Sequence, residues 1–149
     1  MKPPASANDV FKHAVQLLAA RDYTTDQLRK KLALRFGEVP DSVIEQLTAK
    51  HYLDDHRYAQ NLVRRRKARG PVGVQEELAA RGIPAEIIAN VIQEGDWPSL
   101  QEALKARMVV WNLRPPLQRR DAARLFRALA RLGYEEDAIR EEIDQLHEQ

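Results

Sequence analysis

The sequence predicts an all-α protein in which three tandem three-helix repeats form an elongated, curved molecule. Apolar residues recur at helical spacing along nearly the whole chain, and no segment shows the alternation of a strand. Gly37, Gly82 and Gly133 each precede a short break and a new apolar pattern, which is typical of helix ends. Gly37 to Gly82 spans 45 residues and Gly82 to Gly133 spans 51, near the period of three-helix repeats. Because such a unit buries little apolar surface alone, neighbouring repeats must share interfaces.

The first repeat is expected over residues 9–53, after a disordered segment of residues 1–8. Its first helix should cover residues 9–22, because apolar side chains at helical spacing fall on one face. These side chains are Val10, Phe11, Ala14, Leu17 and Leu18.

Capping signals mark the other two helices of this repeat. Thr24 and Gln27 have the spacing of a capping box at the start of the second helix, and Gly37 follows its end. Ser42 and Glu45 repeat the capping-box spacing, so the third helix is expected to begin near Ser42.

The two further repeats are expected over residues 54–95 and 99–147. Asp54 marks the start of the second repeat, and Pro84 fits the first position of a later helix in it. Ser99 with Glu102 gives the third repeat a capping box of its own.

The chain offers no recognisable site for catalysis or for a cofactor. It has no cysteine, which excludes disulfides and thiolate metal sites. It also lacks a phosphate-binding loop, a zinc-protease helix motif, a nucleophile elbow and a dinucleotide fingerprint. Its apolar stretches are too short for a signal peptide or a membrane span. We therefore expect a soluble cytoplasmic protein that is not an enzyme and needs no metal, cofactor or membrane.

Asp54, Asp55 and His56 are the one cluster that resembles a metal site. Adjacent residues at a helix start point in different directions, however, and aspartate there caps free N–H groups and meets the positive end of the helix dipole. We interpret both aspartates as caps of the helix that begins with them.

The aromatic residues lie beside helix boundaries, where packing is a better interpretation than stacking on nucleobases. This applies to Tyr23, Tyr52, Tyr58 and Tyr134. Trp97 and Trp111 flank the first helix of the third repeat and are expected to be structural for the same reason.

Charge is sorted along the chain although its net value is only +2. Residues 57–81 hold seven basic and two acidic side chains, net +5, and residues 105–131 hold eight basic and one acidic, net +7. Residues 134–149 hold one basic and seven acidic, net −6. Such blocks indicate that the partner is a polyanion or an acidic protein groove.

The first basic block carries five cations within six positions of one another, before Gly70-Pro71. At about 100° per residue from Tyr58, Arg66 falls near 80°, within the apolar stripe of the helix. We therefore expect Arg66 to lie under the surface and to pair with a carboxylate. The other four cations of the cluster face away from the apolar stripe or lie at its border, and Arg57 lies on the same polar side. The candidate partner contacts are therefore Arg57, Arg64, Arg65, Lys67 and Arg69.

The second basic block contains a single stripe of candidate contacts. Arg120, Arg124, Arg127 and Arg131 are spaced by 4, 3 and 4 residues, which places them within about 60° on one helix face. Like charges at this spacing repel, and by these helical angles no carboxylate lies between the arginines on the same face. The stripe is either a binding surface or is neutralised by acidic residues of the range 135–142 folding back.

Several short motifs between residues 52 and 139 together match one protein family. They are Tyr52-Leu53-Asp54-Asp55 with Arg57-Tyr58-Ala59, Arg66, Gly70-Pro71, Glu77-Leu78, Arg81-Gly82-Ile83, Arg124-Leu125-Phe126, Arg131-Leu132-Gly133-Tyr134, Asp137 and Ile139. On these motifs the chain resembles the RecX family of regulatory proteins, which act on the bacterial RecA recombinase. The resemblance spans most of residues 10–145. His51 stands where the family usually has glycine, and Val72-Gly73 stands where basic residues are common.

This resemblance implies a monomeric, non-enzymatic protein that docks in the groove of the RecA filament on single-stranded DNA. Docking there would limit filament extension, strand exchange, ATP hydrolysis and co-protease activity, and so modulate recombination, DNA repair and the SOS response. Single-stranded DNA within the filament is a further expected contact. The alternative is a helical module that binds DNA directly. Two features of the sequence argue against this alternative: the acidic tail, and the lack of aromatic residues among the arginines, which leaves little for base stacking.

Overall fold

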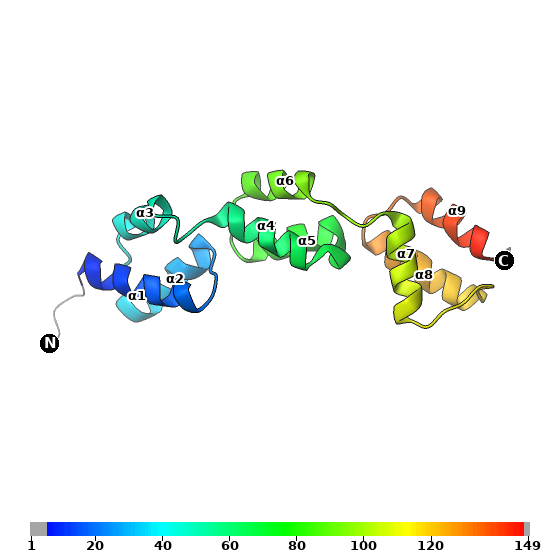
Figure 1. The fold of residues 1–149 in the computed structure, drawn as a ribbon, viewed down its shortest axis with the longest axis horizontal. Coiled ribbons are helices and arrows are strands. Elements are labelled where there is room, and N and C mark those ends of the chain that lie inside the picture. The colour runs from blue at the N-terminus through cyan, green and yellow to red at the C-terminus, as the bar shows by residue number, and fades with distance from the viewer. Residues whose placement is uncertain (1–5, 148–149) are drawn as a thin grey trace. The chain divides into compact units, whose positions relative to one another are not determined.

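The computed structural model describes residues 6–147, and within them it contains nine α-helices, one 3₁₀ turn and no strand. The predicted all-α class is therefore confirmed, and the helices follow one another in three successive sets of three (Figure 1). Their bounds are α1 Ala7–Ala20, α2 Thr25–Phe36, α3 Asp41–Ala49, α4 Asp55–Arg65, η1 Lys67–Arg69, α5 Gly70–Ala80, α6 Ala85–Glu94, α7 Leu100–Val110, α8 Arg119–Arg131 and α9 Glu136–His147.

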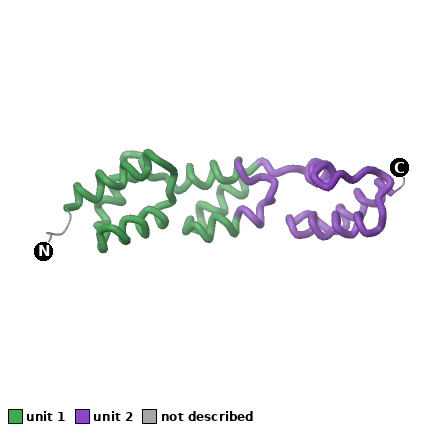
Figure 2. Tube along the Cα trace, turned by 90° about the horizontal axis from the view of Figure 1, so that it is seen from below, with its two compact units in different colours: residues 1–64, 75–95 green, residues 65–74, 96–149 purple. Residues whose placement is uncertain are grey.

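The chain forms two compact units whose boundary passes through α5 (Figure 2). The first unit holds α1 to α3, most of α4, the later part of α5 and α6. The second unit holds residues 65–74 together with α7, α8 and α9. The division of the chain into three repeats, with boundaries at residues 53 and 95, stays a prediction.

Local capping signals place most helix starts correctly. Thr24 and Gln27 form the expected capping box before α2, as do Ser99 and Glu102 before α7. The third helix begins near Ser42 as predicted, at Asp41, but the Ser42–Glu45 capping box is wrong, because the N-cap is Pro40 and makes no side-chain cap.

The predicted disorder of residues 1–8 is wrong for residues 6–8. Ser6 and Asp9 form a reciprocal capping box, so α1 begins at Ala7 rather than at residue 9. Residues 1–5 lie outside the described part of the chain.

The first three helices enclose a core of aliphatic side chains and one tyrosine. Both α2 and α3 pack on α1, and residues with almost no exposed surface fill the space between them. The buried set is Val10, Ala14, Tyr23, Leu28, Leu32, Val43, Ile44, Leu47 and Leu53.

The start of α2 is attached to the second set of helices within the first unit. The buried Thr24 hydroxyl donates to the Arg81 carbonyl at 2.7 Å. Asp55 accepts the Thr25 backbone N–H at 2.8 Å. Asp54, by contrast, caps its own helix by accepting the Arg57 N–H at 3.0 Å. The capping prediction is thus confirmed for Asp54, whereas Asp55 caps the distant helix α2.

Gly82 lies at the same junction and leaves no room for a larger residue. Its φ is +81°, a region that side chains disfavour, and a Cβ built on it would lie 2.4 Å from the Asp26 Cβ. The glycine predicted to end a helix therefore also permits close contact between segments 56 residues apart in the sequence.

The half-buried arginine of this region is Arg81 rather than Arg66. The Arg81 guanidinium donates to the Tyr58 hydroxyl and pairs with Glu77 at 3.3 Å. Arg66 is exposed, because α4 ends at Arg65 and Arg66 has φ −118° and ψ 22°. Helical angles counted from Tyr58 no longer apply after that break, so the prediction that Arg66 lies under the surface is wrong.

We expect Arg81→Ala to lower the free energy of unfolding by about 2 kcal/mol, because it removes the Arg81 cation from the largely buried Glu77 carboxylate. The exposed control Arg64→Ala should change it by less than about 0.5 kcal/mol. Urea unfolding followed by circular dichroism measures both variants. A loss at Arg64 equal to that at Arg81 would contradict this assignment.

The second unit has its own core around α8. Both α7 and α9 pack on α8, and Leu125 and Leu129 are fully buried on the shared side. The first turn of α5 also reaches this unit, since a Cβ on Gly70 would lie 2.8 Å from the Leu132 carbonyl oxygen. The whole core comprises Leu104, Met108, Leu117, Leu125, Leu129, Ile139 and Ile143.

The tyrosines take the packing roles predicted for them. Tyr23 and Tyr58 are buried, and Tyr52 makes an edge contact with Phe11 at 6.3 Å between ring centroids. The Tyr134 hydroxyl donates to the Pro98 carbonyl at 2.6 Å, which ties the start of α9 to the chain that precedes α7.

Candidate partner-binding surface

The arginine stripe of α8 is exposed along its length. Because Leu125 and Leu129 hold the opposite side of the helix against the core, the side chains at positions 120, 124, 127 and 131 must face outward. The structure therefore places the four residues predicted from spacing on one accessible face: Arg120, Arg124, Arg127 and Arg131.

Arg124 differs from its neighbours because it has two partners. Its guanidinium carbon lies 4.1 Å from the centroid of the Trp111 ring, a cation–π contact. Its Nη1 lies 4.0 Å from an Asp121 carboxylate oxygen. Its side chain nevertheless keeps 45% of its surface exposed.

Trp111 and Asp121 correct two expectations from the sequence. A carboxylate does interleave the stripe, and an aromatic ring does lie among the arginines. Asp121 lies three positions before Arg124 and one turn of helix brings them together. Trp111 follows the last residue of α7, and only the packing of α7 on α8 brings it to the stripe. Trp111 also packs on the core, as the structural prediction required.

A shallow hollow of about 230 Å³ opens at this point of the stripe. Its wall combines three cations, one indole and the small side chain of Ala128. The full lining is Trp111, Arg124, Arg127, Ala128 and Arg131.

The other stripe arginines have no carboxylate within 4 Å among residues 6–147; they are Arg120, Arg127 and Arg131. Most of the acidic residues considered as counter-charges are engaged elsewhere; Glu135, for example, accepts the backbone N–H groups of Asp137 and Ala138. Arg140 pairs with Glu136 and Asp137 inside α9, and Glu142 accepts from Gln101. The stripe thus keeps a concentrated positive charge in the part of the chain that the structure describes.

The candidate cations of the second repeat are also accessible, but they fall in different units. Arg57 and Arg64 belong to the first unit, and Arg65, Lys67 and Arg69 belong to the second. Three of them are already engaged. Arg57 donates to the His51 carbonyl at 3.2 Å, Lys67 lies 3.7 Å from Asp96, and Arg69 also has a partner.

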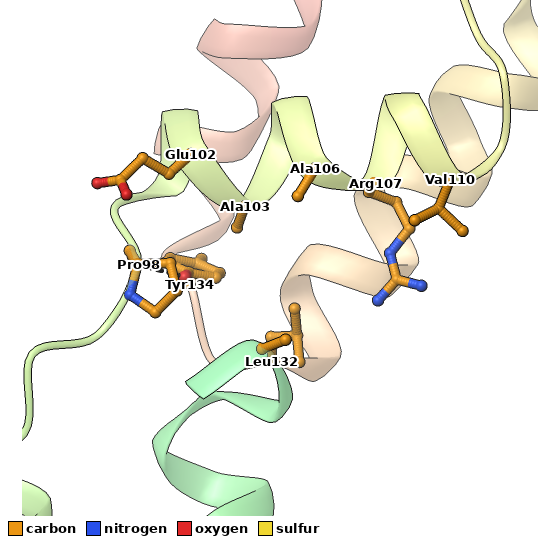
Figure 3. Close-up of a pocket in the computed structure, with 9 residues that line it drawn as sticks. Pro98, Glu102, Ala103, Ala106, Arg107, Val110, Leu132 and Tyr134 are labelled. Carbon is orange, nitrogen blue, oxygen red and sulfur yellow. Dashed lines mark hydrogen bonds between the residues drawn. The ribbon is translucent and has the colours of Figure 1, made fainter. Parts of the chain in front are cut away.

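An apolar groove of about 390 Å³ is a further surface feature of the second unit. Figure 3 shows Ala103 and Ala106 projecting from α7 toward Leu132, with Arg107 and Val110 at one end and Glu102 at the other. Burial raises the pKa of the Tyr134 hydroxyl beside it, and the nearby Glu102 carboxylate adds to the shift. Sequence reasoning missed this groove, because α7 has apolar residues around most of its circumference and no single face stood out.

No group of three or more histidine or acidic side chains in the described ranges is arranged to hold a metal ion. None of the described helices is both long and apolar enough to span a membrane.

Comparison with known proteins decides the family. The family model for the second three-helix domain of RecX matches residues 54–92. The regulatory protein RecX of a Thermus thermophilus strain is 36% identical over 129 residues, covering 85% of this chain and 84% of that protein. The chain belongs to the RecX family. The regulatory protein RecX of Halorhodospira halophila is 33% identical over 141 residues, covering 91% and 87% of the two chains.

The fold agrees with that of a solved RecX structure. The crystal structure of RecX from Lactobacillus salivarius matches with a TM-score of 0.71 and covers 93% of this chain and 97% of that one. At 16% identity this likeness bears on the fold alone.

Much of the RecX resemblance in the second repeat rests on residues that hold the fold together. Asp54 caps α4, Asp55 caps α2, and Gly82 permits the close approach to Asp26. Arg81 and Tyr58 bind each other. The exposed arginine stripe lies outside residues 54–92, the range that the family model matches, although Arg124 and Arg131 belong to the motifs of the resemblance.

Proposed function

We propose that this RecX-family chain is a non-enzymatic regulator that binds the RecA filament on single-stranded DNA and limits its activities. Those activities are filament extension, strand exchange, ATP hydrolysis and co-protease function, and the setting is recombination, DNA repair and the SOS response in the cytoplasm. The observation that carries the proposal is the arginine stripe of α8, in which three of the four cations have no carboxylate within 4 Å among residues 6–147, a surface suited to a polyanionic partner. Membership of a family whose members are named regulatory proteins supports it.

The test is inhibition of the RecA ATPase on single-stranded DNA by the purified chain, which we expect to act as a monomer. RecA should be held at a fixed concentration while the chain is titrated, with RecA lacking DNA as the blank. Unchanged ATP hydrolysis and unchanged filament length by electron microscopy would together overturn the proposal.

The second candidate function is a module that binds DNA directly, and the contact between Trp111 and Arg124 favours it more than the sequence did. Affinity for naked single-stranded DNA, compared with affinity for DNA coated by RecA and a non-hydrolysable nucleotide, separates the two. Much tighter binding to the coated DNA supports the regulator, and equal affinities support the DNA-binding module.

Binding should weaken steeply with salt. If the four stripe arginines contact phosphates of a single strand, the affinity should fall about 50-fold between 50 and 200 mM salt, because each contact releases a condensed counterion. Binding to the RecA filament across a potassium chloride series measures the slope. A flat response would mean that the stripe stays solvated and that apolar contacts hold the complex.

A further inference from the structure

The hollow beside Trp111 combines two kinds of contact that occur together in one class of ligand. Arg127 and Arg131 are one helical turn apart and have no carboxylate within 4 Å among the described residues. Two like charges at this spacing disfavour the helix slightly, so folding does not explain them. A phosphate group bound between them would accept charge-assisted hydrogen bonds from both guanidinium groups.

Arg124 and Trp111 supply the second kind of contact. The Trp111 ring covers one side of the Arg124 guanidinium, and Asp121 stabilises its position. Because 45% of the Arg124 side chain stays exposed and Arg124 lines the hollow, this side chain remains accessible from solvent. Nucleobases stack on guanidinium planes and on aromatic rings.

We infer that this hollow binds one nucleotide unit of a single nucleic-acid strand, with the phosphate on Arg127 and Arg131 and the base over the stack of Arg124 on Trp111. An acidic peptide or free phosphate would bind the arginines but would have no base to stack on Arg124 and Trp111. A strand also fits the length of the stripe, since Arg120 to Arg131 spans about 16 Å of helix. The inference rests on the proposed function and deepens it by naming the filament component that the stripe contacts.

The experiment follows Trp111 directly in the full chain. Both tryptophans are labelled with 5-fluorotryptophan, and Trp97→Phe assigns the two ¹⁹F resonances. Four probes are added without RecA: oligothymidylate, an abasic oligomer of equal length, sodium phosphate and a polyglutamate peptide. Oligothymidylate coated with RecA is then added as a fifth probe. We expect oligothymidylate to shift the ¹⁹F resonance of Trp111 and the abasic oligomer to shift it much less. Sodium phosphate and polyglutamate should not shift it.

The matched variants remove equal charge inside and outside the hollow. Arg127→Gln with Arg131→Gln should weaken oligothymidylate binding at least about tenfold and lower the salt slope by about 1.4. Arg114→Gln with Arg119→Gln, two exposed arginines of the same unit, should leave the Trp111 shift in place. Equal losses for both pairs would overturn the site.

The remaining outcomes separate this inference from the proposed function. An abasic oligomer that shifts Trp111 as strongly as oligothymidylate would overturn base stacking, and an equal shift with polyglutamate would overturn the nucleotide assignment. Inhibition of RecA without a Trp111 shift on naked or coated strand would overturn the hollow alone. A Trp111 shift on the naked strand without inhibition of RecA would support the hollow and overturn the proposed function.

Discussion

Reversal of the uncompensated stripe charges, Arg120→Glu with Arg127→Glu and Arg131→Glu, is expected to abolish inhibition of RecA. The change takes the block of residues 105–131 from net +7 to net +1, since each reversal removes two charges. Single exposed contacts are weak, but the loss of several at once multiplies in affinity. We expect a loss of at least about 100-fold, measured as the concentration that halves RecA ATP hydrolysis.

Arg124 is left in place in this variant because it contacts Trp111 and Asp121 and so belongs partly to the fold. The matched control reverses three exposed cations of the same unit that lie outside the stripe: Lys105, Arg114 and Arg119. Circular dichroism must show equal helicity for both variants. If the stripe variant inhibits as well as the wild type does, α8 is scaffold only.

Gly82→Ala is expected to destabilise the first unit by about 3 kcal/mol. The added Cβ would lie 2.4 Å from the Asp26 Cβ, and this atom is fixed to the backbone of α2 and cannot rotate away. Positive φ adds a further cost. Urea unfolding followed by circular dichroism measures the loss.

Two controls separate the steric overlap from backbone strain. Gly37 has nearly the same φ, +80°, but a methyl group added there would meet no atom within 4 Å beyond its chain neighbours, so Gly37→Ala should cost clearly less. In an Asp26→Gly background the opposing Cβ is gone, and the cost of Gly82→Ala should shrink by at least about 1 kcal/mol. An unchanged cost in that background would contradict the overlap.

The features that the sequence determined are those decided within one turn of helix. The capping boxes at Thr24–Gln27 and Ser99–Glu102 need only residues three apart, and both form as predicted. The spacing of the α8 arginines likewise sets which face they share. These interactions are local, so periodicity and residue type suffice to predict them.

Tertiary structure decided which residues meet across those local elements. The end of α4 at Arg65 moved Arg66 to the surface, and Arg81 became the half-buried arginine that binds Tyr58. Asp55 accepts a hydrogen bond from the backbone N–H of Thr25 at the start of α2, and not from an N–H group of its own helix. Trp111 reached Arg124 only because α7 packs on α8. Periodicity holds only while a helix continues, and contacts between helices depend on where each ends and on the packing that follows.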